Sequence, residues 1–342
     1  MLSYAYKLMS VAAALCAFLC FTACSASSSS SGNGDSAGQP EGDADKSDDD
    51  LNEINADADS ETVETEIDEE SGPMLCNGRA ELCALRLNEV AFPYTHNSFS
   101  NAEDGFVGPN QHFGPARQLA DGVRGLMLDL HYYAVDGKDE IYLCHGDCLF
   151  GKRPLDGALI EIRDFLHDHP YEIMSIIFES YVDPDELTDL AASTGLFDYV
   201  YMGDLTGELP TLAEMIAGSG RLVLFTEGDV GAQTWLHHAW DHVWDTPYSN
   251  TSKDDLSCAL NRGAVTNPLF LINHFASNPL PSEKIAGELN VDPFFEEWVL
   301  DCMQQQGRLP NFIAVDFYDV GKLFDVVDVV NDQALLMVNN RR

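Results

Sequence analysis

Seven short apolar runs recur along the chain after residue 89, and each has the length of a β-strand. They are apolar on both faces, which is typical of parallel strands covered by helices on either side of a sheet. The runs lie at residues 90–92, 125–130, 141–144, 173–178, 222–225, 269–272 and 312–315.

Amphipathic helical patterns separate most of these runs. Within residues 155–168, Leu159, Ile162 and Phe165 share one face, and residues 294–304 carry a second pattern of this kind. Strands that alternate with helices predict an α/β domain with a parallel sheet. At least seven strands in about 250 residues fit an irregular, distorted TIM (β/α) barrel. An open doubly wound sheet is the alternative, although the sequence has no Gly-x-Gly-x-x-Gly turn for a nucleotide.

Polar side chains follow nearly every apolar run at the point where the strand should end. In a β/α barrel the carboxyl ends of the strands meet on one face, where active sites lie. Any one of these residues taken alone is more often a turn residue or a helix cap, but their repetition favours one shared pocket. The candidates are His96, Asn97, Asp129, His145, Glu179, Glu227, His274 and Asp316.

The N-terminal segment is typical of export. Lys7 precedes an uncharged apolar run at residues 8–23, which is short for a permanent membrane span and resembles a secretory signal. Phe21-Thr22-Ala23-Cys24 resembles a lipobox with Phe21 in the usual leucine position. We therefore predict a signal peptide at residues 1–24, lipidation of Cys24 and a cell-envelope lipoprotein on the outer surface or in the periplasm. Ordinary signal cleavage shortly after Cys24 is the alternative.

Residues 25–75 are rich in Ser, Gly, Asp and Glu, with sixteen acidic side chains and one lysine. This composition buries too little apolar surface to offset the entropy of ordering, so it predicts a disordered tether before a globular domain at residues 76–342. The whole chain has a formal net charge of −39. Such a surface repels nucleic acid, so the expected partners are the substrate and, through the lipid anchor, a membrane. We expect a monomer.

Six cysteines remain in the globular part, and an even number in an exported chain predicts disulfides. A zinc site is the competing interpretation, but none of the cysteines forms a Cys-x-x-Cys pair. Nearness in sequence suggests the pairs Cys76–Cys83, Cys144–Cys148 and Cys258–Cys302.

Three motifs in order resemble the phosphatidylinositol-specific phospholipase C X-domain family, above all its small X-domain-only members. They are Thr95-His96-Asn97-Ser98, the segment at residues 122–129 (GVRGLMLD) and the segment at residues 143–146 (LCHG). The resemblance continues to about residue 330. It implies a distorted TIM barrel that cleaves a phosphodiester between glycerol and inositol.

The resemblance also implies roles for three residues. His96 matches the family's general base, which acts on the inositol 2-hydroxyl, and His145 matches its general acid. Two imidazoles suit both tasks near neutral pH. Asp316 is expected to accept a hydrogen bond from His96 and fix its tautomer. The alternative for either histidine is a buried, hydrogen-bonded core residue.

By the same resemblance, Asn97, Asp129 and Glu179 occupy three of the four positions that hold calcium in metal-dependent members. Met127 occupies the fourth, and a thioether is a poor ligand for a hard cation. Metal-independent members carry an arginine where this chain has Asp129. Calcium, with extra waters in its shell, is therefore the expected cofactor.

Other residues are expected around the pocket. Glu227, His274 and Tyr318 are candidates for reading substrate hydroxyls. Arg124 begins its strand, so we expect a structural role, with a phosphate contact as the alternative. Residues 235–244 predict an aromatic-rich helix; its histidines lack the glutamate of a His-Glu-x-x-His zinc motif.

The predicted function is phospholipase C-like cleavage of a phosphoinositide-type or other phosphodiester through a cyclic phosphate. A non-catalytic, surface-tethered binding protein is an alternative that Met127 keeps open. A glycerophosphodiesterase-like hydrolase is another, but Thr95-His96-Asn97 does not match that family's usual His-Arg and Glu-Asn pairs.

Overall fold

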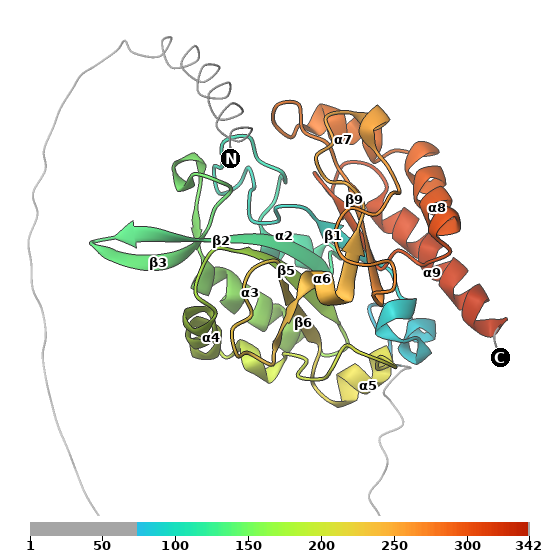
Figure 1. The fold of residues 1–342 in the computed structure, drawn as a ribbon, viewed down its shortest axis with the longest axis horizontal. Helices are drawn as coiled ribbons and strands as arrows, with labels where there is room; N and C mark the ends of the chain where they lie inside the picture. The colour runs from blue at the N-terminus through green and yellow to red at the C-terminus, as the bar shows by residue number, and fades with distance from the viewer. Residues whose placement is uncertain (1–73, 341–342) are drawn as a thin grey trace, which may run out of the picture. The chain divides into compact units, whose positions relative to one another are not determined.

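The computed structural model describes residues 74–340 (Figure 1). The predicted signal peptide, Cys24 and nearly all of the predicted tether lie outside these residues. One sheet runs through the described domain in the strand order β7-β6-β5-β2-β1-β10-β9-β8, and β3 and β4 extend from β2. The strands are β1 (Phe92–Thr95), β2 (Gly125–Val135), β3 (Lys138–Leu143), β4 (Arg153–Pro154), β5 (Met174–Ser180), β6 (Leu222–Thr226), β7 (Leu236–His238), β8 (Val243–Asp245), β9 (Leu269–His274) and β10 (Phe312–Val315).

Every pair of neighbours along the main path of this sheet is parallel, as the doubly apolar runs predict. Within the described domain β7 and β8 are the two ends of that path, so the sheet curls without closing. The predicted α/β class and distorted barrel are confirmed.

Two expected elements are wrong. The run at residues 141–144 belongs to β3, which pairs antiparallel with β2 and forms a hairpin that extends from the sheet (Figure 1). Asp136 and Gly137, with φ of 50° and 79°, make the two-residue turn that such hairpins favour. The segment at residues 235–244 is β7, a four-residue helix and the start of β8 rather than one helix.

Helices connect the parallel strands. The predicted helix at residues 155–168 is confirmed as α3, and the pattern at residues 294–304 extends to Gln306, where Gly307 with φ of 61° ends it. The helices are α2 (Pro115–Ala120), α3 (Leu155–Asp168), α4 (Pro184–Ser193), α5 (Leu212–Ala217), α6 (Ala239–His242), α7 (Glu283–Leu289), α8 (Phe294–Gln306) and α9 (Leu323–Asn339), with 3-10 turns η1 (Ala80–Ala84), η2 (Leu87–Glu89), η3 (Cys148–Phe150), η4 (Leu196–Asp198) and η5 (Lys253–Asp255).

Side chains alternate along each strand between two buried layers. In β6, Leu222 and Leu224 pack outward in the cluster that also contains helix residues, whereas Val223 and Phe225 pack in the cluster inside the curled sheet. Successive strand residues point to opposite faces, so this alternation continues to the strand ends. The inner face is therefore the face that carries side chains into the space at the carboxyl end of the barrel.

Gly125 begins β2 beneath the ring of Tyr94. A Cβ atom at this position would lie 1.7 Å from that ring, so only glycine allows the two strands to approach here.

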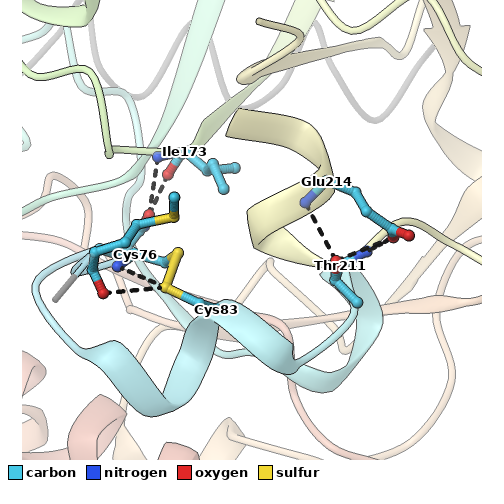
Figure 2. The surroundings of a disulfide bond; sticks show 7 residues. Cys76, Cys83, Ile173, Thr211 and Glu214 are labelled. Atoms are coloured by element: carbon cyan, nitrogen blue, oxygen red, sulfur yellow. Dashed lines mark hydrogen bonds between the residues drawn. A yellow bond between two sulfur atoms is a disulfide. The ribbon is translucent and has the colours of Figure 1, made fainter. Parts of the chain in front are cut away.

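The three predicted disulfides are confirmed as Cys76–Cys83, Cys144–Cys148 and Cys258–Cys302. Figure 2 shows the first beside the start of α5, where Thr211 and Glu214 form a capping box. Three disulfides fit an exported protein. No helix within residues 74–340 combines the length and hydropathy that crossing a bilayer needs.

Candidate active site

Six polar residues share one position relative to the inner core. Each lies two residues after a strand residue of the inner cluster, either in that strand or one residue past its end, for example Asp129 after Met127 and Glu227 after Phe225. The two-residue period therefore turns all six toward the carboxyl end of the barrel interior. We call them the carboxyl-end cluster: His96, Asp129, Glu179, Glu227, Asp245 and Asp316.

The His96 ring is held from three sides. Its Nδ1 lies 2.9 Å from Asp316 Oδ1, and Asn110 Nδ2 donates to the same oxygen at 2.9 Å. The ring stacks on Phe275 with centroids 3.7 Å apart and an interplanar angle of 3°. Donation from Nδ1 to a carboxylate leaves the lone pair on Nε2, which is the tautomer that a general base needs.

Asn110 and its neighbour Gln111 are functional residues that the sequence did not reveal. Gln111 Nε2 donates to the carbonyl of His96 at 2.8 Å and to that of Val315 at 3.1 Å. These residues lie in the connection after β1, where no strand or helix period marks them.

The backbone adopts a left-handed conformation directly after both members of the His96–Asp316 pair. Asn97 has φ of 45° and Phe317 has φ of 49°, in the left-handed region. Asparagine tolerates that region, whereas a bulky aromatic residue is strained there, and strain of this kind clusters at functional sites. The amide N–H of Phe317 donates to the Asn110 carbonyl at 2.8 Å, which ties the strained turn to the Asn110 segment.

His145 follows β3 and meets two of the predicted metal-ligand residues. Its Nδ1 lies 3.0 Å from Asp129 Oδ2 and 3.2 Å from Asn97 Nδ2. The hydrogen bond to Asp129 raises the pKa of His145 above the ordinary imidazole value, and the charges of Glu179 and Asp316 act in the same direction. The side chain is 64 % exposed, so a protonated imidazole here can meet a substrate.

Asp129 and Glu179 lie opposite each other in register on β2 and β5. Asn97 and Asp129 contact the same ring nitrogen of His145, so Asn97 also lies near this pair. The three side chains offer oxygen donors of the hard type that calcium prefers. Met127 packs in the inner apolar cluster and adds no ligand. No group of three or more His, Cys, Asp or Glu side chains placed to hold a metal occurs in residues 74–340, so calcium stays a prediction.

Glu227 belongs to a second group of charges that the sequence revealed only in part. Arg262 Nη1 donates to Glu227 Oε2 at 2.7 Å and Nη2 donates to Asp245 Oδ2 at 2.6 Å. The guanidinium lies 3.9 Å from the Trp240 ring centroid and 4.3 Å from that of Tyr248. Burial raises the pKa of Glu227 to about 7, while Arg262 acts against this. Asp245 is the last residue of β8, a strand that the apolar runs did not predict. Arg262 lies in a loop, where no sequence pattern marks it.

Two expected pocket residues are not brought to this site. His274 has the outward phase of β9: its Nε2 lies 3.0 Å from the Leu289 carbonyl and its ring stacks on Phe295. The inward residue is Asn273, whose Nδ2 donates to Asp245 Oδ2 at 3.0 Å. Tyr318 points away as well, because its hydroxyl donates to Asp121 Oδ2 at 2.7 Å.

Arg124 has the structural role expected of it and does not reach the cluster. It precedes β2 at the amino end, where its Nε donates to Glu172 Oε2 at 2.6 Å and its Nη1 to the Leu119 carbonyl at 2.8 Å. Near β7, the rings of His237 and His242 face each other, with centroids 5.3 Å apart.

Comparison with known proteins shows the family. The family described as PI-PLC X 1 matches residues 82–331. A PI-PLC X domain-containing protein of Arabidopsis thaliana is 32 % identical over 297 residues, which cover 78 % of this chain and 68 % of that protein. A protein of Arthroderma benhamiae named an uncharacterized secreted protein is 29 % identical over 275 residues, which cover 72 % of this chain. The match spans 61 % of the length of that fungal relative.

Solved structures share the fold. The phosphatidylinositol-specific phospholipase C of Listeria monocytogenes superposes with a TM-score of 0.51 at 18 % identity and covers 74 % of this chain and 97 % of its own. The Staphylococcus aureus phosphatidylinositol-specific phospholipase C gives a TM-score of 0.50 at 17 % identity over 72 % of this chain and 93 % of its own. At these identities the likeness shows the fold alone.

Proposed function

The chain belongs to the PI-PLC X domain family, and from that premise we propose that it is a phosphodiesterase with His96 as general base and His145 as general acid. One observation carries the proposal. Two imidazoles project from the carboxyl end of one barrel, and each has a carboxylate at Nδ1. Asn97, the residue directly after His96, contacts the ring of His145.

The proposed reaction needs one proton removed and one delivered. His96 Nε2 takes the proton of a substrate hydroxyl, whose oxygen forms a new bond to phosphorus. The bond from phosphorus to the leaving alkoxide breaks, and His145 gives that alkoxide its proton. The products are a cyclic phosphate and a neutral alcohol.

The two carboxylates serve different protonation states. Asp316 stabilises the imidazolium that forms on His96 during the reaction. Asp129 raises the pKa of His145, because hydrogen bonding and opposite charge favour the charged form that a general acid needs. The contact of Asn110 with Asp316 orients the base without touching the ring's reacting nitrogen.

Calcium is part of the proposal. Asn97, Asp129 and Glu179 would hold it, and it would supply positive charge to the phosphoryl oxygens. The carboxyl-end cluster favours a cation, because five of its six members are carboxylic acids.

The substrate is proposed to carry several hydroxyls, as a phosphoinositide-type diester does. Glu227, Asp245 and Arg262 offer acceptors and donors in one group, beside the rings of Trp240 and Tyr248. Carboxylates and a guanidinium beside aromatic rings suit the polar edges and apolar faces of a polyol. We also propose that the protein is an exported monomer held at a membrane by lipid on Cys24. Its disulfides and its secreted-named relative support export.

The test is turnover of a phosphodiester panel, with and without calcium, followed by phosphorus NMR. His96→Ala should reduce turnover at least roughly 1,000-fold, and a cyclic phosphate should appear with the wild type. His167→Ala is a matched control, because that exposed histidine lies on α3 and contacts Tyr199. Binding without turnover by wild type and His96→Ala alike would instead identify a binding protein. A linear phosphomonoester as the first product would identify a glycerophosphodiesterase-like hydrolase.

A further inference from the structure

The two imidazoles of the proposed site are held to different degrees. His96 is 20 % exposed and is fixed by Asp316, which Asn110 holds in turn, and by the stacked ring of Phe275. His145 is 64 % exposed, and the contacts of its ring with Asp129 and Asn97 meet at the single atom Nδ1. The position of the His145 ring therefore depends on its backbone more than the position of the His96 ring does.

That backbone lies inside a small covalent ring. The Cys144–Cys148 disulfide joins the residue before His145 to the third residue after it. Both cysteines are buried, whereas the three residues between them are exposed. The Cys144 amide also donates to the Asp129 carbonyl at 3.3 Å, so the ring is fixed beside the residue that His145 contacts.

We propose that the Cys144–Cys148 disulfide is a positioning element of the active site that holds the His145 ring at Asp129. Its catalytic consequence rests on the proposed function, whereas its effect on the His145–Asp129 contact does not. A disulfide restricts the positions of the backbone that it closes. A shift of about 1 Å in a catalytic group can cost roughly 100-fold in rate.

The loop lengths argue that this disulfide acts locally. Its cysteines are 4 positions apart, against 7 for Cys76–Cys83 and 44 for Cys258–Cys302. The entropic stabilisation of the folded state grows with the length of the closed loop. The disulfide that brackets the proposed general acid should therefore contribute least to global stability.

Other contacts hold the chain after His145 from Asp147 onward. The Val107 amide donates to the Phe150 carbonyl at 2.7 Å, and Phe106 packs so closely against Gly151 that a Cβ there would lie 2.4 Å from its ring. Asp147 accepts from the Leu149 amide at 3.0 Å, which begins η3. Gly146 has φ of 69°, and nothing lies within 4 Å of the place where a Cβ would be, so the chain is open on that side of the residue after His145.

The test compares the full-length wild type with Cys144→Ser/Cys148→Ser, and with Cys76→Ser/Cys83→Ser as the matched control. Figure 2 shows the control disulfide beside α5 and Ile173, the residue that directly precedes β5 at its amino end. The first readout is the position of the His145 ring, followed by NMR through NOEs between its ring protons and the side-chain amide of Asn97 and assigned with His145→Gln. The second readout is kcat and KM on the diester that the panel identifies.

We expect these NOEs to weaken in Cys144→Ser/Cys148→Ser, because the ring leaves its place beside Asn97 and Asp129. We expect kcat to fall roughly 10- to 100-fold with KM nearly unchanged, since substrate binding does not use the disulfide. The control should keep the wild-type NOEs of His145. If the variant does not fold, reduction of wild type by a phosphine, which becomes its oxide as two thiols form, gives the same comparison once alkylation has located the reduced pair.

Unchanged NOEs of the His145 ring in Cys144→Ser/Cys148→Ser overturn the proposal, and so does an equal change in the control. An inactive wild type on every diester refutes the proposed function instead, and the NOEs still decide the role of the disulfide.

Discussion

His145 Nδ1 lies 3.0 Å from Asp129 Oδ2, and this contact joins the predicted general acid to a predicted metal ligand. The carboxylate cannot serve the imidazole and a calcium ion with the same lone pairs. Protonation of His145 and calcium affinity should therefore depend on each other through Asp129.

Asp129→Asn should lower the pKa of His145, because an amide neither pairs with nor stabilises the imidazolium. The group whose pKa falls is the proposed acid, so the alkaline limb of kcat should move to lower pH. Activity at pH 8 should fall roughly 10- to 100-fold, with a smaller loss at pH 6. A pH profile of kcat checks this, and an alkaline limb at the wild-type position contradicts it.

Asn110→Ala should reduce kcat roughly 10-fold with little change in KM, because Asp316 loses a donor and holds His96 less firmly. Asn331→Ala is the matched control: Asn331 is another buried asparagine, and its side chain bonds to the backbone of Ala91 on the approach to β1. The control should lower the melting temperature without lowering kcat. Equal effects of both variants on kcat would assign Asn110 a role in stability alone.

Glu227→Gln should make the protein more stable at alkaline pH relative to wild type. The folded-state pKa of Glu227 is raised to about 7, so its stabilising protonated form is lost as pH rises from the ordinary carboxyl value through 7. Glutamine removes that loss, which we put at roughly 3 kcal/mol. Urea unfolding at pH 5 and pH 8.5 measures it. A variant that is no better than wild type at the higher pH contradicts this.

His274→Phe should reduce the loss of stability in acid. Burial lowers the pKa of His274 to about 4, so the unfolded chain takes up a proton that the folded protein refuses. Stability should fall as pH drops from about 6.5 toward 4, by roughly 3 kcal/mol from this group. Phenylalanine keeps the stacking on Phe295 without a proton to gain. The slope of unfolding free energy against pH in this window should be smaller in the variant, and an equal slope refutes the argument.

Calcium should raise the melting temperature of the wild type, and a chelator should lower both that temperature and turnover. Glu179→Gln should weaken the response to calcium because it removes one of two anionic donors. Glu161→Gln on α3, where Glu161 pairs with Arg153, is the control and should respond as wild type does. Turnover that is insensitive to chelator would show that the carboxyl-end cluster works without a metal.

The sequence predicted the site better than its surroundings, for a reason that lies in the strand period. His96, Asp129, Glu179 and Asp316 follow visible apolar runs in the inward phase, so strand ends located them. The prediction for His274 was wrong because it followed the titratable side chain and not the two-residue period of β9. That period turns Asn273 inward instead.

Other contributions left no local pattern. Arg262 reaches Glu227 from a loop 35 positions away, and Asn110 reaches Asp316 across 206 positions. Tertiary packing alone brings such pairs together. The Asp136–Gly137 turn did carry a hairpin signal, and it would have shown that the strand before His145 returns along β2.

The central claim is that His96 and His145 act on one phosphodiester as a pair. Its most direct test is kcat/KM for His96→Ala, His145→Ala and the double variant on one substrate. Residues that act as a unit are strongly non-additive, so the double variant should be about as slow as the slower single variant. Full turnover by either single variant, or losses that multiply in the double variant, would contradict the account.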